Sequence, residues 1–582
     1  MLILLSKIFI YTFLFFLKEV KNFLISLREL IFFFYRCNTL DYLKFIKNKD
    51  INFFRNIFFK KFTKKNKMFW KKIHKENLTK KNQENSLLIS CFVHTPGYYM
   101  TNAIIGKYLC KIKNLKPICL IDENDTFGEV FLRSYGYNNF IYIPKNNFFI
   151  RYIYFIKTII FLKDIIDIKS FIKLKINKIK IGLITYEHFL RHSGYGTINK
   201  INFKLIYHFA QSLRVNNFVD NIFKKKKIKS TLQSENQFIP CAFIFQNSLK
   251  HNIKVFSRFG GPQWCGVKMF KNLSKIFDGS GSIEKKLYFK LFIKHRSKIS
   301  KIGSDIVRKR FRGIDKENSV LFNVEENKKN NLINVSRKVL CKKFNLDEKK
   351  PIVYIFSNCL IDGNFVSGWR LFKDNLTCLK FNLDQATKIK NVNWIVKPHP
   401  LESRYPNAKT NTYKEFRKYN KFSNIKLMDG NFSGMTIAKS AKAIVSCFGT
   451  APLEYASYGI PSIIAANARY SHLNIAINPK TIRKYKKYLN SIKYLKKLSK
   501  IQIDKANAQT FFQAKFIRVK LNLLPKFDGM AKFNEYSDSF WKDSIKNIEN
   551  YKIKSDYFDR MLRHQLKKNN ENILNLKLLK KM

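Results

Sequence analysis

Short apolar runs alternate with longer amphipathic segments between residues 86 and 465. A short apolar run bounded by polar or glycine-containing turns is typical of a buried parallel strand, whereas the longer segments have helical periodicity. The runs that we interpret as strands cover 86–93, 117–121, 141–143, 238–245, 253–256, 351–358, 392–397, 425–428, 443–445 and 462–465. This strand–helix succession predicts a doubly wound α/β fold, with helices beginning near Ala103 and covering 371–389, 435–440 and 451–458.

The length of 582 residues suffices for two domains of ordinary size with additional segments at both ends. We expect a hydrophobic and basic helical extension with its connector at 1–84 and a first Rossmann-like domain at 85–345. A second Rossmann-like domain is expected at 346–480, followed by helices at 481–582.

A small-residue turn joins the predicted strand at 443–445 to the predicted helix at 451–458. A phosphate is favoured at such a turn, because the first amides of a helix are unpaired and carry positive partial charge. Gly449 permits close approach of the backbone, and Ser446 and Thr450 supply hydroxyl donors.

Three further side chains extend this candidate phosphate site. Glu454 lies one helical turn after Thr450 and is placed to accept hydrogen bonds from ribose hydroxyls. Lys397 and His399 follow a neighbouring predicted strand and are placed to cover a diphosphate. The alternative interpretation is an ordinary βαβ unit with a threonine cap and a solvated histidine.

The sequence Lys397-Pro398-His399-Pro400, followed by Ser446-x-x-Gly449-Thr450-x-x-x-Glu454-x-x-x-x-Gly459-x-Pro461, resembles the C-terminal nucleotide domain of GT-B glycosyltransferases. The resemblance covers 351–470 and is closest to enzymes of capsular and surface polysaccharides, polysialyltransferases and CDP-glycerol glycerophosphotransferases. It implies a two-domain GT-B fold whose last helices partly cross back to the first domain. It also implies donor-phosphate binding by His399, Ser446, Gly449 and Thr450, with Glu454 at the nucleoside.

The N-terminal half offers candidates for a base that activates an acceptor hydroxyl. His94 and Asp122 follow predicted strands, where ligands bind in doubly wound sheets. The i, i+4 spacing places Glu187 and Arg191 on one helix face, so that the carboxylate should stay ionised beside the guanidinium. That arrangement suits a general base and equally suits a structural ion pair. Asp362 lies in a loop that faces the cleft in similar transferases, although it also suits a simple turn.

Composition excludes several other classes of protein. A hydrophobic content of 46% argues against disorder. The formal charge of +70 accompanies an excess of Lys, Asn, Ile and Phe, which indicates coding bias, and no nucleic-acid motif is present. The ten cysteines are widely spaced, which predicts reduced thiols and no zinc site. Because no D-x-D motif occurs, we expect no metal requirement and no cofactor.

The first forty residues are rich in Phe, Leu and Ile, but the uninterrupted apolar run is too short for a confident membrane span. Two interpretations remain: an amphipathic helix on a membrane surface, or a helix packed against the domain. The amphipathic segment at 148–178 allows the same two interpretations. We expect a cytoplasmic protein, with peripheral contact at the inner face of the plasma membrane as an option.

These expectations combine into a glycosyltransferase that moves a sugar from a nucleotide-activated donor to a surface or capsular polysaccharide or a lipid-linked acceptor. Lys397, His399 and the helix N-terminus would stabilise the leaving phosphate, and closure of the domains would exclude water. A CDP-polyol phosphotransferase of the teichoic-acid type and a non-catalytic, membrane-associated GT-B scaffold remain the alternatives. Nucleic acid is not an expected partner.

Overall fold

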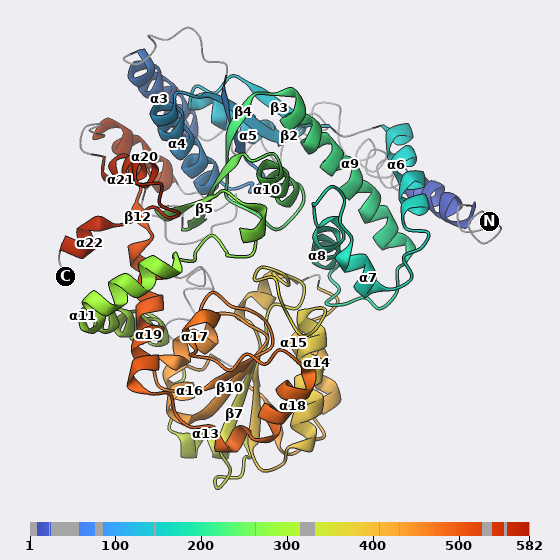
Figure 1. The fold of residues 1–582 in the computed structure, drawn as a ribbon, viewed down its shortest axis with the longest axis vertical. Helices are drawn as coiled ribbons and strands as arrows, with labels where there is room; N and C mark the ends of the chain where they lie inside the picture. Colours follow the sequence, from blue (N-terminus) through green and yellow to red (C-terminus); the bar gives the residue numbers. More distant parts are fainter. Residues whose placement is uncertain are drawn as a thin grey trace.

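The computed structural model contains two α/β domains, each built on one sheet (Figure 1). The residues that it describes are 9–21, 24, 57–75, 85–144, 147–261, 263–314, 332–406, 408–429, 431–525, 538–551, 556–580 and 582.

The N-terminal domain contains a seven-stranded sheet in the order β12-β6-β5-β4-β1-β2-β3. The strands from β5 to β3 are parallel neighbours, and β6 runs antiparallel to β5. Its own strands are β1 (Ser86–Ser90), β2 (Lys116–Asp122), β3 (Phe140–Ile143), β4 (Ile228–Gln233), β5 (Lys254–Gly260) and β6 (Trp264–Phe270). The helices are α4 (Pro96–Lys113), α5 (Thr126–Ser134), α6 (Phe148–Phe161), α7 (Ile168–Lys173), α8 (Ile181–Ser193), α9 (Phe203–Lys225) and α10 (Cys241–Lys250).

The C-terminal domain contains a five-stranded, fully parallel sheet in the order β11-β10-β7-β8-β9. These strands are almost wholly buried, as expected for apolar runs covered on both faces. They are β7 (Ile352–Phe356), β8 (Asn393–Lys397), β9 (Ile425–Leu427), β10 (Ala441–Ser446) and β11 (Ser462–Ile464). The helices are α13 (Arg337–Phe344), α14 (Asn375–Lys388), α15 (Thr412–Phe416), α16 (Gly434–Ser440), α17 (Ala451–Ala456) and α18 (Ile482–Asn490).

The predicted fold class, two Rossmann-like domains with a hydrophobic N-terminal helix and C-terminal helices, is confirmed. The domain boundaries stay a prediction. Upstream of the predicted boundary at residue 346, α13 already packs Leu340 and Cys341 into the same core cluster as strand residues of the C-terminal domain.

The strand predicted at 238–245 is wrong, because α10 covers most of that segment. All its residues from Cys241 to Leu249 are buried, so the helix shows no polar face from which its periodicity could be recognised. The actual strand, β4, was not predicted, because its buried positions include Ser230, Thr231 and Gln233. The helix expected to begin near Ala103 begins earlier. It starts at Pro96, and this proline stands in its first turn.

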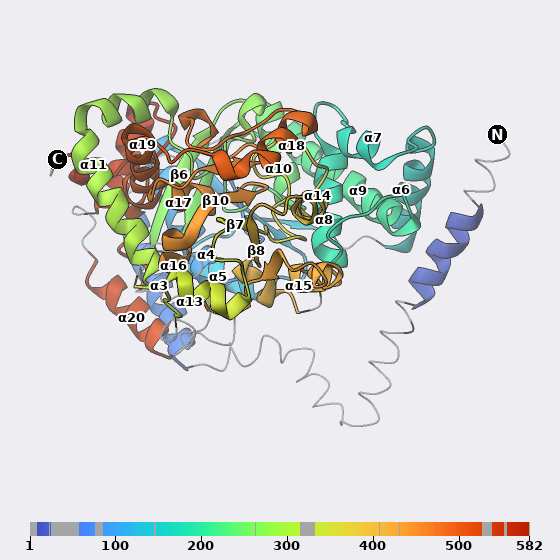
Figure 2. The same cartoon turned by 90° about the horizontal axis from the view of Figure 1, so that it is seen from below.

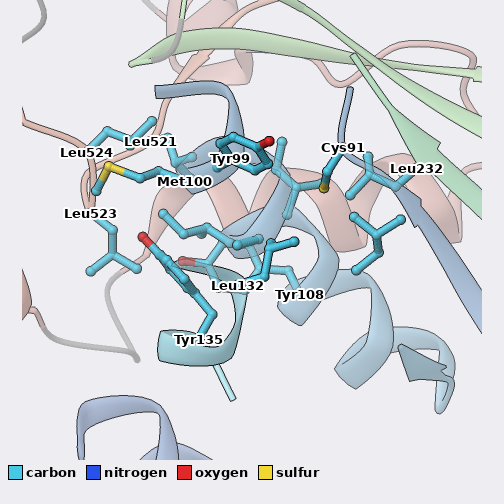
Figure 3. Close-up of a cluster of buried hydrophobic side chains, with 14 of the residues drawn as sticks. Cys91, Tyr99, Met100, Tyr108, Leu132, Tyr135, Leu232, Leu521, Leu523 and Leu524 are labelled. Atoms are coloured by element: carbon cyan, nitrogen blue, oxygen red, sulfur yellow. The ribbon is translucent and has the colours of Figure 1, made fainter. Parts of the chain in front are cut away.

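The chain passes from the N-terminal domain to the C-terminal domain and later returns to the N-terminal domain. α11 (Lys285–Phe311) and α19 (Lys500–Phe511) pack side by side at the left of Figure 1. β12 (Val519–Lys520) then pairs antiparallel with β6. Leu521, Leu523 and Leu524 join a core cluster that includes Met100 of α4 (Figure 3). The remaining helices are α20 (Asp538–Glu549), α21 (Tyr557–Lys567) and α22 (Leu576–Lys580).

Two helices of the N-terminal extension are described. α3 (Ile57–Lys75) packs against α20, and its Phe59 contacts Trp541 edge to face. The helix at 9–21, drawn at the blue end of the chain in Figures 1 and 2, buries Phe15 among Phe148, Tyr152 and Phe155 of α6.

The opposite side of that first helix is exposed, as Phe9, Phe13 and Leu17 illustrate. Of the two interpretations made from the sequence, packing against the domain is therefore confirmed for one face of the helix. No helix among the described residues has both the length and the apolar character required to cross a bilayer. The rest of the predicted extension at 1–84 lies largely outside the described residues.

Candidate functional site

A cavity of about 610 Å³ lies between the two domains, and both contribute to its wall. This volume is in the range of clefts that hold small-molecule ligands. Its polar and charged lining includes Tyr98, Glu187, Ser234, Glu235, Gln246, Arg258, Asn358, Asp362, His399, Thr450, Arg469 and Arg518.

The parallel register of the C-terminal sheet explains why its site residues meet. Phe356 of β7 pairs with Ser446 of β10 on one side and with Lys397 of β8 on the other. The carboxyl ends of three neighbouring strands therefore lie level. The loops that follow them place Asn358, His399 and Gly449 on one wall of the cavity; Asn358 was not among the predicted site residues.

The turn from Ser446 to Thr450 presents its backbone and one hydroxyl to the cavity. Gly449 has a φ of 115°, which favours glycine, and Thr450 is exposed. Ser446 is buried, and its Oγ lies 2.8 Å from the carbonyl oxygen of Phe448. Ser446 therefore supports the turn from behind, while Gly449 and Thr450 line the cavity.

The helix after the turn is shorter than predicted. α17 ends at Ala456 instead of Tyr458, and it contains six residues. Its dipole is correspondingly small, so local N–H groups and the Thr450 hydroxyl are the main donors on this wall.

His399 lines the cavity, and its backbone N–H donates to Ser357 Oγ over 2.8 Å. Burial lowers the pKa of His399 to about 4, so the imidazole is neutral at pH 7 in the unliganded protein. The expectation that His399 supplies a positive charge is thus wrong for this state. Lys397 is half-buried outside the cavity lining, and burial lowers its pKa to about 8.

Glu454 does not line the cavity. Its carboxylate accepts a hydrogen bond from Arg310 Nη1 of α11 over 3.0 Å. The predicted contact with a ribose would require this ion pair to open, and it stays a prediction.

The predicted pairing of Glu187 with Arg191 is not formed. Arg191 instead pairs with Asp362 across the domain interface, at 3.0 Å. Tyr405 also donates to Asp362. Glu187 is 2% exposed, and its Oε1 accepts the backbone N–H of Phe365 at 3.3 Å.

The protonation state expected for Glu187 is therefore wrong as well. Burial raises the pKa of Glu187 to about 8, and the backbone N–H of Phe365 and the charge of Arg370 oppose that rise only in part. Glu187 still lines the cavity, as a largely protonated carboxylic acid at pH 7.

Glu235 is a cavity residue that the sequence analysis missed. It follows β4, and its Oε1 accepts the backbone N–H groups of Asn236 and Gln237 at 2.7 and 2.8 Å. Burial raises the pKa of Glu235. The polar turn Ser234-Glu235-Asn236 was the available signal, but it could not be interpreted because the strand before it was not identified.

His94 and Asp122 lie outside the cavity lining, in a separate cluster with Tyr99 and Asp125. His94 Nε2 is 3.6 Å from Asp122, and Nδ1 is 3.4 Å from Asp125. Hydrogen bonding to Asp122, and then to Asp125, raises the pKa of His94 to about 9. A histidine that is protonated at pH 7 is a poor general base, so the structure does not favour His94 for that role.

Within the described part of the chain, no group of three or more His, Cys, Asp or Glu side chains is arranged to hold a metal ion. The nine described cysteines are all buried and form no disulfide.

No protein-family model and no curated protein sequence matches this chain. Solved structures with a similar fold include the beta Kdo 2,4 transferase KpsC of Thermosulfurimonas dismutans, at 9% identity over 51% of this chain and 82% of that one, with a TM-score of 0.30. A glycosyltransferase from Rickettsia africae ESF-5 shares 14% identity over 74% and 94%, with a TM-score of 0.25.

The wall teichoic acid polymerase TagF shares 9% identity over 88% of this chain and 100% of that chain, with a TM-score of 0.20. These scores are low, so the likenesses transfer neither ligands nor residue roles. The class that the fold itself defines is a GT-B-type pair of Rossmann-like domains around a shared cavity.

Proposed function

We propose that the protein is a glycosyltransferase that moves a glycosyl group from a nucleotide-activated donor to a hydroxyl group of a surface or capsular polysaccharide or a lipid-linked acceptor. One observation supports this above the others. His399, Gly449 and Thr450 of the C-terminal domain share one cavity with the carboxyl groups of Glu187 and Glu235 of the N-terminal domain.

The C-terminal wall would hold the donor phosphates. Gly449 allows a phosphate to approach the backbone, and the Thr450 hydroxyl is exposed to receive it. As the bond to the transferred group breaks, negative charge grows on the leaving phosphate, and preorganised donors of this kind stabilise it. A phosphate beside His399 would also favour protonation of its imidazole.

The N-terminal wall would supply the base. We assign this role to Glu235, whose carboxylate is oriented by two backbone N–H groups and whose raised pKa improves its basicity. Glu187 retains its proton at pH 7 and would act as a neutral neighbour. Two carboxyl groups in unlike environments can thus take unlike roles.

A CDP-polyol phosphotransferase is the second candidate. Arg258, Arg469 and Arg518 also line the cavity, and cationic side chains would suit a reaction in which the transferred group itself carries a phosphate.

The binding step can be tested by thermal shift of the full chain with CMP, CDP, UDP and GDP. We expect one nucleotide to raise the melting temperature by several degrees, since a ligand that binds only the folded state stabilises it. Thr450→Val and His399→Ala should reduce this shift, whereas Thr387→Val, on the outer face of α14, should not. A folded wild-type protein that responds to none of the four nucleotides would instead support a non-catalytic scaffold.

We also propose peripheral contact with an anionic membrane. Phe9, Phe13 and Leu17 of the first helix and Phe149 and Ile153 of α6 are exposed apolar side chains on two packed helices. Positive charge elsewhere on the chain, formally +70 in total, would add electrostatic attraction.

Flotation of the full chain with phosphatidylcholine vesicles, with and without phosphatidylglycerol, tests this contact. Phe9→Ser combined with Phe13→Ser should weaken binding to the anionic vesicles. Ile482→Ser, at an exposed position of α18, is the matched control and should bind as the wild type does. Equal flotation of all three proteins would contradict the assignment of this surface.

A further inference from the structure

Three arginines from distant parts of the chain converge on the cavity. Arg258 lies on β5, Arg469 follows β11, and Arg518 directly precedes β12. We call these residues the arginine cluster. Arg310, which pairs with Glu454, is close enough to influence Arg518.

Two guanidinium groups of this cluster, those of Arg258 and Arg518, are buried in part or whole and only partly satisfied. Arg258 is 1% exposed, and its Nε and Nη2 have no hydrogen-bond partner among the described residues. Its guanidinium lies 4.3 Å from the ring centre of Tyr98. Arg518 Nε is likewise buried without a partner in the described part of the chain. Buried donors and charges without acceptors are costly, so they indicate a missing anionic partner.

Glycines keep the space that these guanidinium groups occupy. A Cβ on Gly260 would lie 3.2 Å from Arg518 Nε, and one on Gly281 would lie 2.8 Å from Arg469 Nη1. Gly279 is similarly close to Arg469, at 3.0 Å from Nε. All three glycines line the cavity, so side chains there would crowd the arginines at the cavity wall.

The charge in the cavity is not balanced by its acidic side chains. Burial, together with the charges of Arg310, Arg469 and Arg258, lowers the pKa of Arg518 to about 10, which leaves it protonated at pH 7. Glu187 is largely neutral at that pH, Asp362 is already paired with Arg191, and Glu235 supplies at most one negative charge for three guanidinium groups. Repulsion among the arginines therefore persists until an anion binds.

We propose that the arginine cluster is a second anion subsite, which takes a carboxylate or phosphate group on the transferred group or on the acceptor, in addition to the nucleotide phosphates. This inference rests on the proposed function. Arg258 and Arg518 belong to the N-terminal sheet and its returning segment, whereas the turn at Gly449 and Thr450 belongs to the C-terminal domain. The substrates would then include an acidic sugar, a phosphorylated polyol or an acidic polymer.

Inorganic phosphate is the first probe, titrated calorimetrically into the full chain saturated with the nucleotide that the thermal screen identifies. We expect phosphate to bind this complex, and Arg469→Gln and Arg518→Gln each to weaken that binding by about tenfold or more, since a hydrogen bond to a charged group is lost. For Arg518→Gln, nucleotide affinity should remain within about threefold, since the charge is removed from the N-terminal wall and not from the turn at Gly449. Arg483→Gln, on the exposed face of α18, removes the same charge elsewhere and should change neither affinity.

The outcomes separate the two proposals. If the wild type binds no nucleotide, the proposed function fails. If nucleotide binds but phosphate does not bind the complex, or if both variants lose nucleotide and phosphate affinity equally, the separate subsite is overturned. Phosphate binding that is insensitive to both variants identifies an adventitious ion only and also overturns it.

A second measurement needs no nucleotide. Without added anion, Arg469→Gln and Arg518→Gln should raise the melting temperature because they relieve repulsion, and sulfate should stabilise the wild type more than either variant. If the Arg518→Gln variant fails to fold, Arg469→Gln provides the same test, because Arg469 is an exposed loop residue. Unchanged melting temperatures and equal sulfate responses would contradict the inference.

The source of the anion is distinguished by two matched pairs of ligands. A nucleotide sugar with an acidic sugar is compared with its neutral counterpart on the same nucleotide, and an acidic oligosaccharide is compared with a neutral one in the presence of nucleotide. Loss of discrimination in Arg469→Gln within the first pair assigns the anion to the transferred group, and loss within the second assigns it to the acceptor. If the wild type does not discriminate between the ligands of either pair, the proposal is overturned.

Discussion

The two walls of the cavity are built in different ways. On the C-terminal wall, Gly449 and Thr450 are adjacent in the sequence, and His399 follows β8, which β7 separates from β10 in the same sheet. On the N-terminal wall, Glu187 comes from a helix, and Glu235 comes from a loop after a strand. The comparison shows that one wall is a local structural motif, whereas the other exists only after distant segments have packed together.

The walls also differ in electrostatics. Thr450 is exposed, and the C-terminal wall offers backbone, hydroxyl and neutral imidazole groups beside two charged residues, Asp362 and Arg469. Glu187 and Arg258 on the opposite wall are 2% and 1% exposed and contain ionisable groups. Electrostatic interactions are stronger where water is excluded, so changes to the N-terminal wall should have the larger effects.

The largest effect is expected for Glu235→Gln. Loss of a general base typically reduces turnover by about 10²- to 10⁴-fold, while donor binding at the opposite wall should be almost unchanged. Initial rates and nucleotide affinity measured on the same preparation check this expectation. Glu348→Gln, at an exposed position, is the control. Equal loss of turnover and nucleotide affinity would show that the two walls do not act separately.

Glu187→Gln tests how far burial controls the N-terminal wall. The folded protein favours the neutral carboxyl group, with a pKa of about 8 against an ordinary value of 4.5. The wild type should therefore lose stability as pH rises from about 4.5 to 8, by a few kcal/mol in total. The glutamine variant cannot ionise, so this loss should be absent.

Urea unfolding of both proteins at pH 5, 6.5 and 8 measures that difference. The variant should resemble the wild type at pH 5 and exceed it at pH 8, because glutamine can still accept the N–H of Phe365. Glu284→Gln at an exposed position should follow the wild type at each pH. A pH-independent difference between Glu187→Gln and wild type would refute the assigned protonation state.

Gly449→Ala tests the C-terminal wall. A φ of 115° is unfavourable for alanine, so the substitution should cost about 1–3 kcal/mol in stability or nucleotide affinity. The nearest obstacle to its Cβ is Asn358 Nδ2, at 3.4 Å, so backbone strain outweighs crowding. Thermal-shift and calorimetric measurements together would detect this loss of stability or nucleotide affinity. An unaffected variant would show that the turn relaxes freely.

The smallest effect is expected for Arg191→Ala. The ion pair with Asp362 joins the two walls, but the arginine side chain is 37% exposed, so solvent screens the interaction. We expect a loss of about 0.2–1 kcal/mol in unfolding free energy that decreases with added salt. A double-mutant cycle with Asp362→Asn would measure the interaction energy of the pair. A salt-independent loss of several kcal/mol would contradict the expected weak interaction.

The contrast between the walls also explains what the sequence could predict. Apolar strands such as β7, β8 and β10 could be located because burial on both faces leaves a continuous hydrophobic run. The turn at Gly449 and Thr450 could be predicted because its residues are contiguous. Its short following helix differed from the prediction only at its end.

The N-terminal wall could not be predicted to the same extent. Glu235 was missed because the buried polar residues of β4 do not form an apolar pattern. The sequence spacing of Glu187 and Arg191 suggested a local ion pair, but tertiary structure gave each a partner from the other domain. The arginine cluster depends on residues separated by more than 200 positions, and no local pattern reports such convergence.

The returning C-terminal segment has a consequence for biosynthesis. Val519, Leu521 and Trp541 complete the core of a domain whose first strand, β1, leaves the ribosome more than 400 residues earlier. Domains made first usually fold first, but this one must keep an apolar surface open until the final helices emerge. A ribosome that stops before residue 519 would therefore release a nascent chain that encodes both walls of the cavity but exposes a core that chaperones and proteases can recognise.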